Sequence, residues 1–138
     1  MTDIYVDGSF KEGKYAWGFV AYQDGEEIHA ENGVGDNAEA VAMRNVAGEL
    51  AAAMRAVNWA IKEGVDKIVI HHDYTGIAAW VNGSWKAKKV WTQKYAKFMQ
   101  SHYLRGFVRF EQIVGHSGNR GNERADELAG SAYGKNAP

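Results

Sequence analysis

The sequence predicts a mixed α/β domain built around one five-stranded sheet, and three observations support this prediction. Three strand-like segments follow one another at the start of the chain, with short turn signals between them. Two further strand-like segments alternate with stretches of helical periodicity. The length of 138 residues suits a single domain with one core, and no internal repeat is visible.

The predicted strands fall into an antiparallel set and a parallel set. Strands are expected at residues 3–10, 15–23, 27–34, 67–72 and 107–114, with a long helix at about 43–63. One or two helices precede the fifth strand, and a final helix follows it. Turns at Gly13-Lys14 and Asp24-Gly25 join the first three strands as antiparallel hairpins. The later strands alternate with helices and should therefore run parallel.

Two of the predicted helices are amphipathic and carry an acidic residue beside their apolar side. The long helix has an apolar stripe formed by Val46, Leu50, Met54, Val57 and Ile61. Glu49 lies at the flank of that stripe. The final helix has a stripe formed by Ala125, Leu128, Ala129, Ala132 and Tyr133. Asp126 lies on its border, so we expect Asp126 to be semi-buried.

Composition excludes several classes of protein. Hydrophobic residues make up 46% of the chain, which is typical of a packed globular domain. Because there are no cysteines, a disulfide framework and a thiolate metal site are both excluded. The N-terminal residues do not resemble a secretory leader, and no apolar run is long enough to cross a bilayer. We therefore expect a cytoplasmic protein without membrane association.

The formal net charge of −1 hides an uneven distribution of charge. Between Asp73 and Glu111 there is no acidic residue, whereas seven basic residues occur there: Lys86, Lys88, Lys89, Lys94, Lys97, Arg105 and Arg109. The rest of the chain contains nine basic residues and all 17 acidic ones, which gives it a formal net charge of −8. Such a layout suits a polyanion bound beside a metal cation.

Four carboxylates occupy positions that allow either an ordinary or a functional interpretation. Asp7 lies inside a predicted strand, where it can start a turn through its own backbone. Asp73 ends another strand, where it can cap the following helix. Glu49 and Asp126 can be solvated helix residues beside basic side chains. For each residue taken alone, the ordinary interpretation is favoured.

The combination of these residues favours a metal site. A right-handed crossover helix would place the strands of Asp7 and Asp73 side by side and would carry Glu49 on its flank. Clustered carboxylates repel one another, and divalent cations are the usual compensation. Oxygen ligands without cysteine favour Mg²⁺, with Mn²⁺ as the alternative, over zinc. Two such ions about 3.5 to 4 Å apart would support phosphoryl transfer.

The chain resembles the type 1 ribonuclease H family in motifs that span nearly its whole length. These motifs are "IYVDGSF", "MRNVAGELAA", "IVIHHDYTGIAAWV" and "GHSGNRGNERADELA", in the family's order and spacing. The wording "MRNVAGE" with "DYTGIAAW" is most similar to the group found in Firmicute bacteria. The resemblance implies a ribonuclease H-like fold, in which three antiparallel strands are followed by two parallel ones and the sheet is flanked by helices.

The resemblance also implies an activity and a set of catalytic residues. The activity is metal-dependent endonucleolytic cleavage of the RNA strand of RNA·DNA hybrids, with 5′-phosphate and 3′-hydroxyl products and two ions per site. The residues that match the family's metal-binding carboxylates are Asp7, Glu49, Asp73 and Asp126. His116 matches a loop histidine that moves a proton or assists product release, although a histidine between glycines is commonly only solvated. Glu123 matches a glutamate near the metals and equally complements the helix dipole.

Substrate-binding residues are likewise carried over from the resemblance. Gly8, Ser9 and Asn45 match positions that read the 2′-hydroxyl of RNA. Arg44 departs from the family pattern, in which Thr-Asn-Asn precedes the catalytic glutamate, and would give the DNA-phosphate pocket a charged donor. The basic segment 85–98, "WKAKKVWTQKYAKF", contains Lys86, Lys88 and Lys89, which would contact phosphates. Alternatively, that segment is an amphipathic helix with buried aromatic residues and solvated lysines.

Two other functions remain open on the sequence. One is a related nuclease on the same fold with a different substrate class, and the other is a nucleic-acid-binding module without catalysis. On the leading interpretation we expect residues 1–134 to form a single ribonuclease H catalytic domain and 135–138 a flexible tail. Its partner would be the RNA·DNA hybrid, bound by a monomer with no obligate protein partner.

Overall fold

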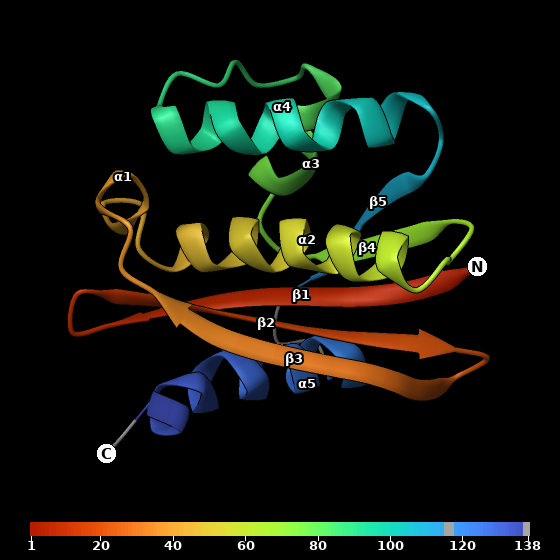
Figure 1. Cartoon of the computed structure of the whole chain (residues 1–138), viewed down its shortest axis with the longest axis horizontal. Coiled ribbons are helices and arrows are strands. Elements are labelled where there is room, and N and C mark those ends of the chain that lie inside the picture. Colours follow the sequence, from red (N-terminus) through yellow and green to blue (C-terminus); the bar gives the residue numbers. More distant parts are fainter. Residues whose placement is uncertain (115–117, 137–138) are drawn as a thin grey trace.

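A computed structural model describes residues 1–114 and 118–136 of the chain. The sheet forms the middle layer, with α2, α3 and α4 on one face and α5 on the other (Figure 1). The elements in chain order are β1 (Thr2–Lys11), β2 (Lys14–Gln23), β3 (Glu26–Gly35), α1 (Ala38–Val41), α2 (Asn45–Lys62), β4 (Ile68–His72), α3 (Gly76–Asn82), α4 (Val90–Leu104), β5 (Val108–Gln112), α5 (Arg120–Ser131) and the 3-10 helix η1 (Ala132–Asn136).

The sheet confirms the predicted fold class. Its strand order is β3-β2-β1-β4-β5. The pairs β1–β2 and β2–β3 are antiparallel, whereas β1–β4 and β4–β5 are parallel. In the β1–β4 ladder Tyr5 lies opposite His71, so Asp7 and Asp73 are each two residues beyond the last paired position. The strands of these two carboxylates are therefore neighbours, as the sequence predicts.

Both hairpins use two-residue turns with positive φ angles. Asp24 and Gly25 have φ angles of 51° and 80°, and Glu12 and Gly13 have φ angles of 51° and 77°. Left-handed backbone at both central positions matches the twist of the strands that the turn connects. The first turn is thus one residue earlier than predicted, because Lys14 already belongs to β2.

Helix α2 buries a different side from the one that its large apolar residues predict. Its buried positions are mostly small: Ala47, Gly48, Glu49, Leu50, Ala51, Ala52, Ala53, Ala56, Val57 and Ala60. Ile61, expected in the stripe, is 45% exposed, whereas Glu49 is only 3% exposed. The prediction that Glu49 lies at the flank is therefore wrong. Alanines allow the helix to approach the sheet closely, and this gain in packing outweighs the burial of a few larger side chains.

Two glycines set the distance between α2 and the sheet. A Cβ atom on Gly48 would overlap the carbonyl oxygen of Ala16, and one on Gly8 would overlap the backbone at Asn45 and Glu49. Neither position can therefore hold a larger residue without displacing the helix. This close approach brings the N-terminal part of α2, which includes Glu49, against the strand that carries Asp7.

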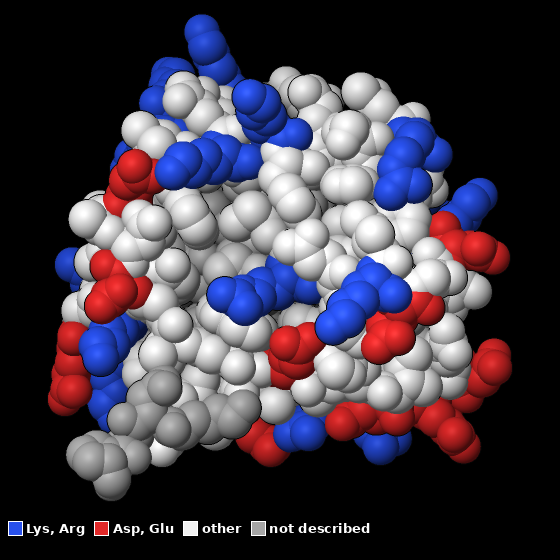
Figure 2. All heavy atoms as spheres, viewed as in Figure 1, with Lys and Arg blue, Asp and Glu red and all other residues white. Residues whose placement is uncertain are grey.

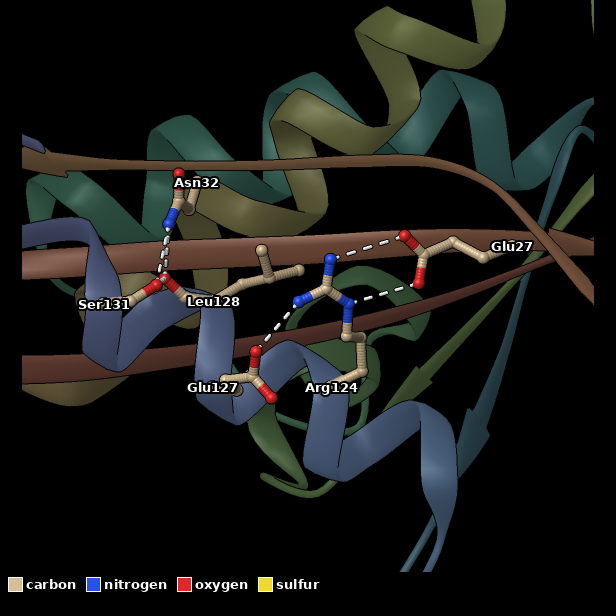
Figure 3. A network of polar contacts seen from close by, with 6 residues as sticks. All are labelled: Glu27, Asn32, Arg124, Glu127, Leu128 and Ser131. Atoms are coloured by element: carbon tan, nitrogen blue, oxygen red, sulfur yellow. Dashed lines mark hydrogen bonds and ion pairs between the residues drawn. The ribbon is translucent and has the colours of Figure 1, made fainter.

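Helix α5 is attached to the edge strand β3 by polar contacts (Figure 3). The guanidinium of Arg124 donates to both carboxylate oxygens of Glu27, at 3.1 and 3.4 Å, and the side chain of Asn32 donates to the carbonyl oxygen of Leu128 at 2.7 Å. Ala125, Leu128 and Ala129 are buried as predicted. Asp126 is exposed and not semi-buried, because α5 buries the stripe itself and leaves this border position in solvent.

The main core lies between the sheet and the helices α2 and α4. Its fully buried side chains include Phe19, Leu50, Ile70, Tyr95 and Met99. The inward position of Tyr95 and Met99 confirms an amphipathic helix in α4, whereas Lys86, Lys88 and Lys89 precede that helix. Among the described helices, none combines the length and the apolar character that a membrane crossing requires.

Candidate metal and nucleic-acid site

The candidate site lies where the pairing between β1 and β4 ends. Asp7 lies in β1 just beyond the residues paired with β4, and Asp73 directly follows the last residue of β4. Ligands of parallel sheets gather at the carboxyl ends of the strands. Both carboxylates are half-buried. The backbone N–H of Gly8 donates to Oδ1 of Asp7 at 2.8 Å, which fixes the orientation of that side chain.

Glu49 completes a cluster of three carboxylates. One carboxylate oxygen from each of Asp7, Glu49 and Asp73 lies within 4.8 Å of the other two. Glu49 is the buried member, and its Oε2 atom has no hydrogen-bond partner among the described residues. A buried acceptor without a partner costs free energy unless a donor or a cation satisfies it. Three convergent oxygens and one unsatisfied oxygen fit a divalent cation with oxygen ligands.

The cluster favours protonated carboxyl groups as long as no cation compensates the charge. Burial, followed by repulsion from Asp73 and Asp126, raises the pKa of Asp7 to about 7, although the Gly8 N–H opposes this change. Burial, followed by the charges of Asp73 and Asp7, raises the pKa of Glu49 well above its ordinary value. Two carboxyl groups with raised pKa values in one cluster are characteristic of functional sites.

The other predicted site residues on α5 lie at the edge of this cluster. Asp126 is exposed and is not one of the three residues whose oxygens converge. A hydrogen bond to Asp126 nevertheless contributes to the raised pKa of Asp7, so the two carboxyl groups are neighbours. Glu123 is exposed in the first turn of α5. His116 lies outside the described residues.

The predicted substrate residues surround the start of α2. Arg44 precedes the helix, Asn45 begins it, and both are exposed one turn before Glu49. The Arg44 guanidinium lies 5.7 Å from the centre of the Phe10 ring. The hydroxyl of Ser9 has other partners, since it donates to the carbonyl oxygen of Ala129 and contacts the hydroxyl of Tyr133 at 3.0 Å. The Ser9 side chain therefore connects β1 to α5 and η1.

The three predicted lysines line one cavity. Lys86, Lys88 and Lys89 are exposed and border a cavity of about 320 Å³, together with Met43, Val46, Tyr74, Trp80 and Thr92. This cavity joins the basic segment to the start of α2. In the view of Figure 2, basic side chains gather toward the top, over α4, and acidic side chains toward the bottom. The three lysines thus share a cavity with Met43 and Val46, which lie on either side of Arg44 and Asn45 in the chain.

Sequence reasoning missed the polar residues that surround Asp73. The backbone of Tyr74 faces the Glu49 carboxylate and opposes the rise in the pKa of that group. The amide of Gln112 donates to the carbonyl oxygen of Asp73 at 3.1 Å. Hydrophobic periodicity predicts neither contact, because one uses a main-chain group and the other an exposed strand residue. The available signal is weak, because Gln112 lies two residues before the end of the strand predicted at 107–114.

Comparisons with known proteins agree with this architecture. A sequence profile of the RNase H family matches residues 1–133. The ribonuclease H of Cyanothece sp. is 30% identical over 143 residues, which cover 94% of this chain and 87% of that protein. The holo form of a ribonuclease H domain from D. hafniense is 43% identical, with a TM-score of 0.56, and the match covers 95% of this chain and 87% of that one.

A third comparison concerns the fold alone, since the identity is only 19%. The structure of LC11-RNase H1 in complex with an RNA/DNA hybrid matches with a TM-score of 0.78 and covers 98% of both chains. The sheet order agrees with the fold that the family resemblance implies, and the acidic cluster agrees with its metal site. Together with the profile that spans 133 of 138 residues, these observations lead to one assignment. The chain belongs to the ribonuclease H family.

Proposed function

We propose that the protein hydrolyses the RNA strand of RNA·DNA hybrids with the help of two divalent cations, Mg²⁺ or Mn²⁺. The observation that carries this proposal is the convergence of Asp7, Glu49 and Asp73 within 4.8 Å, with one buried glutamate oxygen lacking a partner. Membership of the ribonuclease H family supports the substrate class. The hybrid named in the LC11-RNase H1 complex supports it as well.

The carboxylates would hold the cations and orient the scissile phosphate. Asp7, Glu49 and Asp73 would supply the converging oxygen ligands, and Asp126 would add a further oxygen from α5. Bound divalent ions supply Lewis acidity, which favours ionisation of a water molecule and stabilises charge on the leaving oxygen. The water oxygen bonds to phosphorus, the bond from phosphorus to the 3′-oxygen breaks, and that oxygen takes up a proton. The products carry a 5′-phosphate and a 3′-hydroxyl.

The surrounding residues would select and hold the hybrid. Asn45 and the backbone at Gly8 read the 2′-hydroxyl, which only the RNA strand has. Arg44 and the lysines that line the adjoining cavity contact phosphates. His116 moves a proton at the leaving oxygen, and Glu123 supports the α5 side of the site. Ser9 contributes through its backbone, since its hydroxyl is hydrogen-bonded within the protein.

A panel of labelled duplexes tests the proposal. RNA·DNA, RNA·RNA and DNA·DNA duplexes of one sequence are incubated with the protein in Mg²⁺ or in chelator. We expect cleavage of the RNA strand of the hybrid in Mg²⁺ only, with end groups that ligase and phosphatase treatment identify as 5′-phosphate and 3′-hydroxyl. Equal cleavage of RNA·RNA would indicate the other substrate class, and binding without cleavage would indicate a non-catalytic module.

A further inference from the structure

The three residues that follow β4 have their polar groups held by different elements. The carbonyl oxygen of Asp73 accepts from Gln112 at 3.1 Å. The backbone of Tyr74 faces the Glu49 carboxylate and opposes the rise in the pKa of that group. The carbonyl oxygen of Tyr74 accepts from Nδ1 of His72 at 2.9 Å, so that ring nitrogen carries the proton. The segment that carries the Asp73 carboxylate is therefore fixed by hydrogen bonds from β4 and β5.

Gln112 is the one side chain of the described residues that holds this segment at both ends. It is the last residue of β5 and pairs with His72 of β4. Its Nε2 atom donates to the carbonyl oxygen of Asp73 at 3.1 Å and to Oγ1 of Thr75 at 2.9 Å. A primary amide has two N–H groups, so both bonds form at once. The two bonds enclose Tyr74 and limit rotation of the main chain at Asp73.

Thr75 contributes a second sign that this contact is specific. It stands at the start of α3, where a threonine hydroxyl usually accepts from the backbone of the first turn. No such capping bond forms here, and the hydroxyl instead accepts from Gln112. Helix α3 thus lacks a stabilising side-chain cap, and the Thr75 hydroxyl contacts strand β5 instead.

We propose that Gln112 is a positioning residue that holds the Asp73 carboxylate ready for a divalent cation; this inference rests on the proposed function. Gln112 is exposed, and its bonds go to the main chain and to Thr75, so it acts through Asp73 and not on substrate. Residues that orient metal ligands in this way typically change metal affinity by about 10- to 100-fold when they are replaced. Because the amide is exposed, its loss changes the stability of the fold little.

The test compares Gln112→Met with Gln93→Met. Methionine keeps the length of glutamine and removes both donors. Gln93 is a matched control, because it is also exposed and its Nε2 donates to one carbonyl oxygen, that of Ala87. Mn²⁺ binding to the hybrid-free protein is measured by isothermal titration calorimetry. We expect the Kd of Gln112→Met to rise about tenfold, and that of Gln93→Met to stay within about twofold of the unchanged chain.

Activity and stability measurements separate positioning from a structural role. We expect Gln112→Met to need more Mg²⁺ for half-maximal cleavage and to regain its kcat at saturating Mg²⁺, with an unfolding midpoint in chelator close to that of Gln93→Met. Thr75→Val should give part of the defect, and Thr75→Ser should restore normal affinity. An unchanged Mn²⁺ Kd in Gln112→Met overturns the inference, even if the hybrid is cleaved normally. If the unchanged chain binds Mn²⁺ but cleaves no duplex, the proposed function fails and the Kd comparison still decides the role of Gln112.

Discussion

Asp7 carries a proton near neutral pH while the metal is absent, and this links folding stability to pH. Its pKa is about 7 in the folded chain, against about 4 in an unfolded one. Between these values the folded state binds a proton that the unfolded state has lost, so stability falls as pH rises through this window. Above pH 7 the charged carboxylate opposes folding until a cation compensates it. The charged Asp7 carboxylate thus lowers the stability of the metal-free fold and would also be a ligand for the metal.

Replacing Asp7 by asparagine should abolish cleavage and preserve hybrid binding. The change removes a ligand charge and leaves the basic surface intact. Cleavage is measured in Mg²⁺, and binding by gel shift in chelator. We expect at least about a thousandfold loss of turnover, given the several kcal/mol that metal stabilisation contributes. Near-normal turnover in this variant would remove Asp7 from the mechanism.

The same variant should be more stable than the unchanged chain at pH 8 in chelator. Asparagine cannot ionise, so it escapes the cost that burial places on the charged form. The gain is expected to be about 1 to 4 kcal/mol at pH 8 and to vanish toward pH 4, because one pKa unit corresponds to about 1.4 kcal/mol. Urea unfolding at both pH values measures it. Asp24→Asn, in an exposed turn, is the control; an equal gain there would contradict the explanation.

Arg44 adopts a backbone conformation that is unfavourable for a residue with a side chain. Its φ and ψ angles are 54° and −129°. Strained residues of this kind cost about 1 to 3 kcal/mol and concentrate at functional sites. The strain occurs directly before Asn45 and one turn before Glu49, where the hybrid would bind.

Arg44→Gly should therefore separate stability from binding. Glycine removes the strain, so the free energy of unfolding should stay the same or rise by up to about 1 kcal/mol. Hybrid affinity should fall several-fold, because a charged phosphate donor is lost. Thermal unfolding and hybrid titration at one salt concentration measure the two effects. A variant with lower stability and unchanged affinity would show that Arg44 is structural.

At the scale of elements, the contact between β1 and α2 positions the site. Gly8 and Gly48 allow the backbones to meet, and this contact puts Glu49 beside Asp7. Helix α5, attached to β3 through Arg124 and Asn32, contributes Asp126 from the other face (Figure 3). The Arg124 ion pairs are partly exposed and contribute little free energy. The pair with Glu27 connects α5 to β3, whereas the pair with Glu127 lies within α5.

Gly48→Ala should cost stability and activity together. The added methyl group overlaps the carbonyl oxygen of Ala16, so α2 must move away from the sheet and carry Glu49 with it. Overpacking of this kind costs about 1 to 3 kcal/mol. Gly130→Ala, in α5 with open space around its Cα, is the control and should be neutral or stabilising. Denaturant unfolding and the Mg²⁺ dependence of cleavage measure both effects; equal behaviour of the two variants would contradict the close-packing argument.

At the scale of the whole molecule, charge is divided between a basic and an acidic part. The segment between Asp73 and Glu111 has only basic charges, and the remainder has a balance of −8. Phosphates would therefore approach from the side of α4, where Figure 2 shows the basic side chains gathered. The acidic part would repel the duplex elsewhere and limit binding to one orientation.

Replacing Lys86, Lys88 and Lys89 by glutamine should weaken the salt dependence of hybrid binding. Each phosphate contact releases about one counterion, so the slope of log affinity against log salt should decrease by about one for each lysine that contacts a phosphate. Binding is measured in chelator between 50 and 300 mM salt, and cleavage at saturating hybrid should persist. An unchanged slope would exclude these lysines from the binding surface.

Alternation, turn residues and helical spacing predict the number of strands, their order along the chain and their parallel and antiparallel pairing. The acidic site residues were instead predicted from their combination and from the family resemblance, because each one alone has an ordinary explanation. The burial of Glu49, the exposure of Asp126 and the contact of Gln112 with the segment of Asp73 are visible only in the folded chain. The reason is that burial and hydrogen bonding depend on how closely separate elements approach. For α2 that approach is set by Gly8 and Gly48, which are forty positions apart in the chain. The residue pattern within β1 or within α2 therefore cannot predict it.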